Sequence, residues 1–98
     1  MTEHVFRATI WEHAPDEPSS WHFLTLPGDV ADEVRLESGP PAGFGSVRVE
    51  VTIGSTTWRT SLFPDSKARS FVLPVKKRVR RAAGLGAGDE CEVRLRPV

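Results

Sequence analysis

The chain has 98 residues, 39% hydrophobic and 27% charged, a composition that predicts one globular domain over residues 1–98 and excludes a disordered or fibrous protein. Thirteen basic and thirteen acidic side chains give zero formal charge, which argues against coating of nucleic acid or membranes through bulk charge. One cysteine, Cys91, excludes internal disulfides and multi-cysteine zinc motifs. Without a targeting segment or an apolar run of membrane-spanning length, we expect a cytoplasmic protein that does not contact membranes.

The first half of the chain is predicted to hold two strands and one short helix. The expected elements are a strand at residues 5–12, a loop at residues 13–20, a strand at residues 21–26, a helix that begins at Pro27, and a glycine- and proline-rich loop at residues 38–45. Proline is tolerated in a first helical turn, because its missing N–H would be unpaired there anyway. Val30 and Val34 would then share one apolar helix face.

The second half is predicted to hold four strands and another helix. A strand at residues 47–53 alternates valine and isoleucine with polar residues, and Gly54-Ser55 is typical of a two-residue hairpin. The remaining expected elements are a strand at residues 56–63, a turn at 64–66, a strand at 70–73, a helix that Pro74 opens and Gly84 ends, and a last strand in which Cys91, Val93 and Leu95 alternate with charged residues.

These elements predict both the core and the fold class. One order of features occurs twice: a strand, Leu-Pro, a helix with valines four residues apart, a glycine-rich break and another strand. This indicates an internal pseudo-twofold repeat. We expect an all-β fold, a small closed barrel with two short helices, because closure removes the exposed edges of many short strands. The predicted core residues are Phe6, Ile10, Val47, Val49, Val51, Ile53, Trp58, Leu62, Leu73, Val79, Val93 and Leu95.

An ordered set of sequence blocks resembles one known family. The blocks are Trp-Arg-Thr-Ser-Leu-Phe-Pro at residues 58–64, Phe-Val-Leu-Pro-Val-Lys-Lys at residues 71–77, Val79-Arg80 and Gly88-Asp89. Together they are similar to the family of unknown function DUF1905. The resemblance implies a double-split β-barrel, related in shape to the AbrB, MazE and SpoVT domains of transcription factors and antitoxins. It implies no activity, ligand or catalytic residue.

The second predicted helix carries the main candidate site. Residues 66–88 hold seven bases and no acid, whereas residues 1–37 hold eight acids and two arginines. Lys76, Lys77, Arg80 and Arg81 would point outward from the Val75/Val79 stripe, although charged residues also simply keep an exposed helix soluble. Lysines at a helix start oppose the helix dipole, and a bound phosphate or carboxylate would reverse that penalty. We therefore expect an anion site, which Arg35 and Arg48 could extend.

A second candidate site lies on the strand at residues 56–63. Alternation places Arg59 and Ser61 on the face opposite Trp58, so that one face is core and the other could line a groove. An ordinary core tryptophan beside exposed sheet residues explains the same pattern. Trp11 and Trp21 are not placed by the pattern, but an exposed tryptophan would indicate stacking on a base or ring.

Metal and nucleophile chemistry have little support in the sequence. The three histidines and Cys91 lack metal-ligand spacing, and Cys91 falls on the inward side of its strand. Ser61 has no nucleophile-elbow motif, and we expect neither a cofactor nor a metal. The leading hypothesis is a non-enzymatic binding module that holds nucleic acid or a phosphorylated small molecule. The alternative is a small-molecule-binding or weakly catalytic pocket at the Arg59/Ser61 face.

Overall fold

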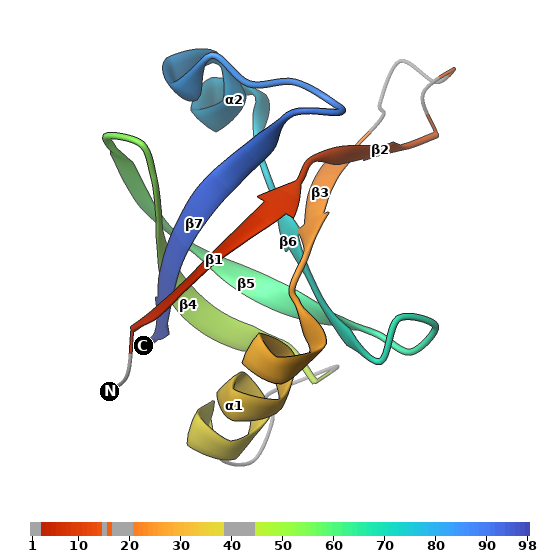
Figure 1. The fold of residues 1–98 in the computed structure, drawn as a ribbon, viewed down its shortest axis with the longest axis vertical. Helices are drawn as coiled ribbons and strands as arrows, with labels where there is room; N and C mark the ends of the chain where they lie inside the picture. The colour runs from red at the N-terminus through yellow and green to blue at the C-terminus, as the bar shows by residue number, and fades with distance from the viewer. Residues whose placement is uncertain (1–2, 15, 17–20, 39–44) are drawn as a thin grey trace.

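The computed structural model describes residues 3–14, 16, 21–38 and 45–98, so the loops expected at residues 13–20 and 38–45 lie mostly outside the described residues. Within the described residues, the structure is mainly β, with two helices (Figure 1). The elements are β1 (His4–Thr9), β2 (Trp11–His13), β3 (Trp21–Thr25), α1 (Gly28–Ser38), β4 (Val47–Ile53), β5 (Thr56–Asp65), β6 (Ser70–Pro74), α2 (Lys77–Ala83) and β7 (Glu90–Pro97).

The described strands form one curled antiparallel sheet. Their order is β1-β7-β4-β5-β6-β3-β2, and every neighbouring pair runs antiparallel. The two end strands, β1 and β2, follow each other directly in the chain with only Ile10 between them. The sheet therefore curls until its two ends nearly meet, which confirms the predicted all-β, barrel-like fold (Figure 1).

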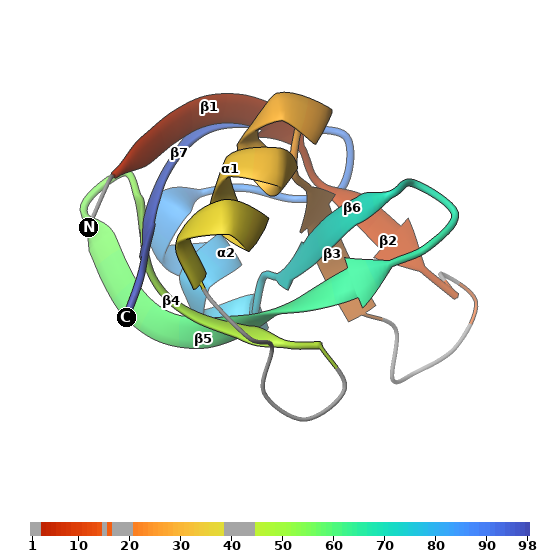
Figure 2. The same cartoon turned by 90° about the horizontal axis from the view of Figure 1, so that it is seen from below.

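Strand pairing also shows the internal repeat. The units β3–α1–β4 and β6–α2–β7 have the same order of elements, and β3 pairs with β6 while β4 pairs with β7. The single strand β5 pairs with both β4 and β6. On the other side of the repeat two strands take the equivalent place, since β1 pairs with β7 and β2 pairs with β3. The two helices consequently lie at opposite ends of the sheet, and Figure 2 shows α1 across the lower end with α2 behind it.

The single strand expected over residues 5–12 is wrong, because the chain changes its pairing partner at Ile10. The Ile10 amide donates to the Asp89 carbonyl at 2.9 Å, and its carbonyl accepts from Gly88 at 2.8 Å. These bonds attach Ile10 to the turn before β7 while its side chain stays in the core. β1 therefore ends on β7, and β2 begins on β3.

Two proline assignments need correction. Pro74 does not open the second helix: it ends β6 opposite Phe23, and the helix begins at Lys77 after an extended Lys76. Pro64 does not begin a turn either, because it pairs with Phe71 inside β5. Proline offers no N–H to a ladder and fits a strand only where no donor is needed there. Sheet pairing thus continues past both positions where the local pattern predicted a break.

The predicted ends of the hairpin and of the second helix are confirmed. Gly54 adopts φ +60° in the two-residue link between Ile53 and Thr56, the geometry that the Gly-X hairpin requires. Gly84 follows α2 at φ +69°, and its amide donates to the carbonyl of Arg81. Glycine takes these left-handed conformations without the clash that a Cβ atom would cause.

The core lies inside the curled sheet and beneath both helices. All twelve predicted core residues are buried, which confirms that prediction. The core also includes further residues of strands, of α1 and of the segments before the two helices: Leu24, Leu26, Val30, Ala31, Val34, Phe71, Val75 and Cys91. Neither described helix has the length and apolar character needed to cross a membrane.

Candidate functional site

The segment that enters α2 is attached to β3 by one backbone hydrogen bond. The Val75 amide donates to the His22 carbonyl at 2.9 Å, directly beyond the last β3–β6 pair at Phe23 and Pro74. Val75 buries its side chain in the core, whereas the next residue, Lys76, is exposed. This bond therefore places the first basic residues of α2 beside the beginning of β3.

An open cleft of about 360 Å³ lies at this junction. Its lining residues come from the start of β3, the end of β6, the link after it and α2: Trp21, His22, Pro74, Val75, Lys76, Lys77 and Arg80. Among the residues that the structure describes, the lining holds three basic side chains and no carboxylate. Its volume lies within the range usual for small-ligand sites. The cleft can therefore hold a compact anionic group.

The bases of this region have no acidic partners among the described residues. Arginines elsewhere form ion pairs, such as Arg7 with Glu90 at 2.8 Å and Arg96 with Glu50 at 3.2 Å. In the described part of the chain, no ion pair involves a base between residues 67 and 81. Their charge is thus free to act on a ligand, and within the described residues no acid forms an ion pair with the cleft lysines.

Arg80 is held in place by the backbone of the cleft. Its Nε donates to the Val75 carbonyl at 3.2 Å, and its side chain is half-buried. Because α2 spans only seven residues, about two turns, its dipole is a small contribution. Lys76 and Lys77, together with this oriented guanidinium, would therefore supply most of the attraction for an anion.

Trp21 and His22 form the wall of the cleft on the β3 side. Trp21 is 59% exposed, which is unusual for a large aromatic side chain. His22 is mostly buried, with Nε2 3.9 Å from a Glu12 carboxylate oxygen and with no partner for Nδ1 among the described residues. Sequence reasoning left Trp21 unplaced and did not assign His22 to this site. The sequence offered only the expectation that an exposed tryptophan would indicate stacking, and the exposure itself is visible only in the structure.

The structure brings together only part of the predicted basic set. Arg81 is exposed and does not line the cleft, although it lies on the same helix. Arg35 cannot extend the site, because it belongs to α1 at the opposite end of the sheet (Figure 1). There its guanidinium lies 5.2 Å from the centre of the Phe71 ring. Arg48 lies near the start of β4 and donates to Ser61, so it does not extend the cleft either.

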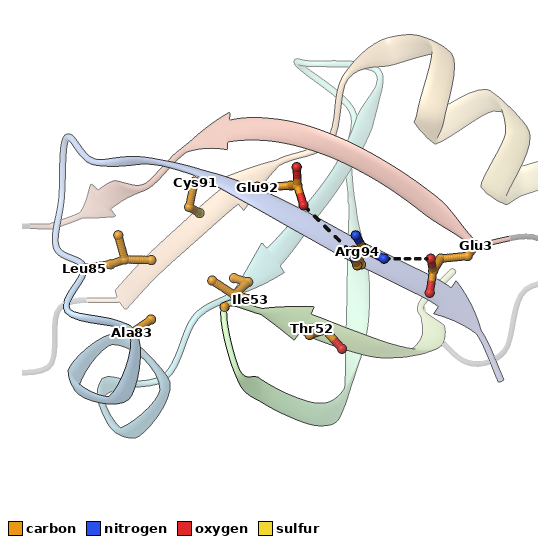
Figure 3. Close-up of a pocket in the computed structure, with 9 residues that line it drawn as sticks. Glu3, Thr52, Ile53, Ala83, Leu85, Cys91, Glu92 and Arg94 are labelled. Carbon is orange, nitrogen blue, oxygen red and sulfur yellow. Dashed lines mark ion pairs between the residues drawn. The ribbon is translucent and has the colours of Figure 1, made fainter.

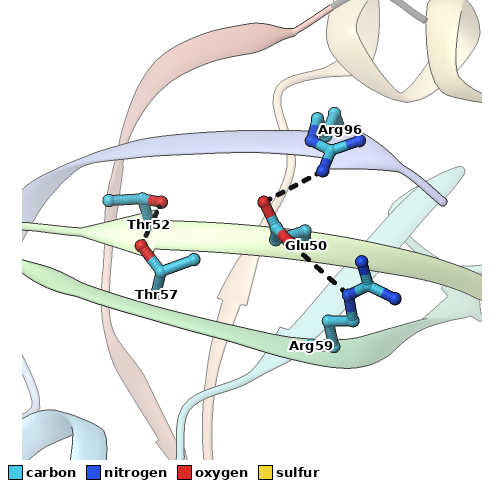
Figure 4. A network of polar contacts seen from close by, with 5 residues as sticks. All are labelled: Glu50, Thr52, Thr57, Arg59 and Arg96. Carbon is cyan, nitrogen blue, oxygen red and sulfur yellow. Dashed lines mark hydrogen bonds and ion pairs between the residues drawn. The ribbon is translucent and has the colours of Figure 1, made fainter.

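The alternative site on β5 has partners from neighbouring strands. Arg59 lies 3.4 Å from Glu50, which also pairs with Arg96, and Thr52 and Thr57 share a hydrogen bond beside them (Figure 4). Trp58 points to the opposite face and is buried in the core. The described clefts do not include Trp58, Arg59 or Ser61 in their lining.

A larger cleft of about 730 Å³ lies between the β4–β5 hairpin, the end of α2 and β7. Ile53, Ala83, Leu85 and Cys91 form its apolar wall (Figure 3). The charged side chains at its rim pair with each other, since Arg94 lies 3.6 Å from Glu3 and 3.7 Å from Glu92. Burial raises the pKa of the Cys91 thiol, so this sulfur is protonated near neutral pH. Among its described residues, the cleft thus offers neither unpaired charge nor a reactive thiolate.

In the described residues, no group of three histidine, cysteine or carboxylate side chains is placed to hold a metal ion. Residues 6–95 match the family described as "Domain of unknown function (DUF1905)". A search of curated proteins found no match. The match covers nearly the whole chain, including both β3 and α2.

Proposed function

Because the chain belongs to the DUF1905 family, whose description states no activity, we propose a function from its own residues: a non-enzymatic binding module that holds a phosphate-bearing ligand. The ligand, a nucleic acid or a phosphorylated small molecule, binds in the cleft between β3 and α2. The observation that carries this proposal is the convergence of Lys76, Lys77 and Arg80 on one cleft, whose described lining includes no carboxylate.

Phosphate fits this arrangement better than a carboxylate does. A phosphate group offers several acceptor oxygens that can bond to three cations at once, and each charge-assisted bond is stronger than a neutral one. A lysine ammonium is a point charge on a flexible stem, so it can move toward a phosphate oxygen. The planar guanidinium of Arg80 can donate hydrogen bonds to phosphate oxygens through two nitrogens. Among the described residues, the bases have no acidic partner that a ligand would first have to displace.

The zero net charge of the chain limits which ligands are expected. A long duplex would meet acidic as well as basic surfaces, and its general attraction would be weak. Salt screens the cationic side chains of the cleft beyond about 10 Å, so recognition concentrates on one or a few phosphates. Binding should accordingly weaken with added salt, with a slope of about two for three contacts to single-stranded nucleic acid.

The test compares two double variants with the same change of charge. Lys76→Glu/Lys77→Glu reverses the cleft lysines, and Arg78→Glu/Arg81→Glu reverses two exposed bases on the same helix that do not line the cleft. Binding of a labelled DNA and RNA pool and of inorganic tripolyphosphate is measured at about 50 mM salt. The cleft variant should lose about tenfold or more in affinity, and the control should lose clearly less.

Both variants should unfold at nearly the wild-type temperature, because exposed side chains contribute little to stability. Equal losses in the two variants would show that the charge of the helix as a whole, and not the cleft, attracts the ligand. Binding that survives in the cleft variant would place the site elsewhere. A parent protein that binds none of these probes would refute the proposal.

A further inference from the structure

Three aromatic side chains form a row on the outer face of the β2–β3 hairpin. Trp11 lies opposite Phe23, and Trp21 lies two residues before Phe23, so strand alternation puts all three rings on one face. Trp11 is 37% exposed, and Trp21 is the most exposed tryptophan in the described chain. A large aromatic side chain that is packed in a core typically buries about 150–250 Å² of its surface. This row therefore leaves much ring surface open to solvent.

The rings are held in a fixed arrangement. The Trp21 and Phe23 rings are nearly parallel, at 10° with centroids 6.1 Å apart, and the Trp11 centroid lies 5.1 Å from that of Phe23. Trp11 Nε1 donates to Thr25 Oγ1 at 3.0 Å, which fixes the orientation of the indole. A platform that is already ordered loses little side-chain entropy when a flat ligand binds.

The aromatic row is continuous with the cationic cleft. Trp21 belongs to both, since it contacts Phe23 on one side and lines the cleft with Lys76 and Lys77 on the other. The hydrogen bond between Val75 and His22 fixes this neighbourhood through the backbone. Flat rings and unpaired cations are therefore joined at Trp21.

We infer that the ligand of this site is single-stranded nucleic acid, with its phosphates at Lys76, Lys77 and Arg80 and its bases stacked along Trp21 and the neighbouring rings. This inference rests on the proposed function and specifies its ligand. Proteins that bind single strands combine a positive groove with aromatic platforms in this way.

Charge and ring surface together favour a single strand over the other phosphate ligands. In a duplex the bases are stacked on each other and cannot lie on protein side chains. A small phosphorylated metabolite would fill the cleft but would leave Trp11 and Phe23 without a role in binding. A single strand uses both surfaces, because its bases and phosphates alternate along one chain.

The experiment separates base stacking from phosphate binding. The probes are a labelled oligothymidylate of about twelve nucleotides, an abasic strand with the same number of phosphates, a duplex of the same length and inorganic tripolyphosphate. The wild-type protein should bind the oligothymidylate at least fivefold more tightly than the abasic strand, since one stacked base alone contributes a factor of about five or more. The duplex should bind less tightly than the single strand.

Trp21→Ala should lower the affinity for oligothymidylate about tenfold and the affinity for tripolyphosphate clearly less, because the three cationic side chains remain. Trp21→Phe, which keeps a flat ring, should restore much of the loss. Phe63→Ala is the matched control, because Phe63 is 43% exposed but lies on β5, outside the row. Circular dichroism checks that each variant folds, which is expected for substitutions of exposed side chains.

The outcomes distinguish the two proposals. If Trp21→Ala binds oligothymidylate like the wild type, or if the abasic strand or the duplex binds as tightly as the oligothymidylate, the stacking inference is overturned. In each of these cases, loss of tripolyphosphate binding in Lys76→Glu/Lys77→Glu would still support the phosphate site. If no probe binds at low salt, both proposals fail.

Discussion

Replacement of His4 tests what holds α1 on the sheet. His4 lies on β1 and is only 5% exposed, and both of its ring nitrogens face carboxylates of α1. Nε2 lies 2.9 Å from Glu37 Oε1, and Nδ1 lies 3.2 Å from Glu33 Oε2. His4→Ala removes both contacts and leaves the Glu37 carboxylate, which is 26% exposed, without this partner.

The magnitude follows from the burial of each partner. A hydrogen bond to a charged group contributes about 1.5–3 kcal/mol when it is shielded, which applies to the Glu37 contact. Glu33 is 62% exposed, so solvent screening reduces its contact to under about 1 kcal/mol. The Glu37 hydrogen bond therefore sets the expected loss at about 1.5–3 kcal/mol, or about 6–24 °C in the unfolding midpoint of a domain this small.

Urea and thermal unfolding of His4→Ala, Glu37→Gln and the double variant measure this loss as a double-mutant cycle. We expect a coupling of about 1–3 kcal/mol between His4 and Glu37. Arg7→Ala is the control on the same strand, because its ion pair with Glu90 is exposed and its loss should leave the midpoint almost unchanged. A coupling of zero, or a His4→Ala variant as stable as wild type, would refute the assignment.

Three other predictions concern the core, a helix end and the thiol. Val51→Asp should prevent folding, because an unpaired buried charge costs several kcal/mol, about the stability of a small domain, and a native far-UV circular dichroism spectrum would contradict this. Gly84→Ala should destabilise by about 1–2 kcal/mol in urea unfolding, because φ at this position is +69°, whereas Gly86→Ala, with negative φ and open space, should not. Burial raises the pKa of the Cys91 thiol in the folded protein above its unfolded value of about 8.5. The stability that the buried, protonated thiol contributes is therefore complete below the unfolded pKa and is lost as pH rises through the folded pKa. Cys91→Ala should therefore lose less stability than wild type between neutral pH and pH of about 10, and identical profiles would contradict the raised pKa.

Local features of the chain determined most of the elements and the core. Alternation at Val47, Val49 and Val51 specified both a strand and its buried face, because successive side chains in a strand point to opposite sides. The Gly54 hairpin and the Gly84 helix end followed from the left-handed geometry that glycine adopts freely. Such features depend on residues close together in sequence, so the sequence alone could reveal them.

Pairing between distant segments decided what the local pattern could not. The break at Ile10 exists because the chain changes from β7 to β3, and Pro64 stays in a strand because Phe71 lies opposite it. Likewise, His4 acquires its carboxylate partners only when α1 packs on β1. Each of these contacts joins segments that periodicity describes separately, so their partners depend on how the sheet closes.

The candidate site shows the same division. The basic run identified Lys76, Lys77, Arg80 and Arg81, but only the orientation of α2 determines that Arg81 lies outside the cleft. Trp21 lies 55 residues before Lys76 in the sequence, and its position beside the cleft depends on the bond between Val75 and His22. Charge density is a property of composition and is visible in the sequence. The exposed Trp21 ring lies beside these charges only because of strand pairing, since the hydrogen bond between Val75 and His22 brings two distant segments together.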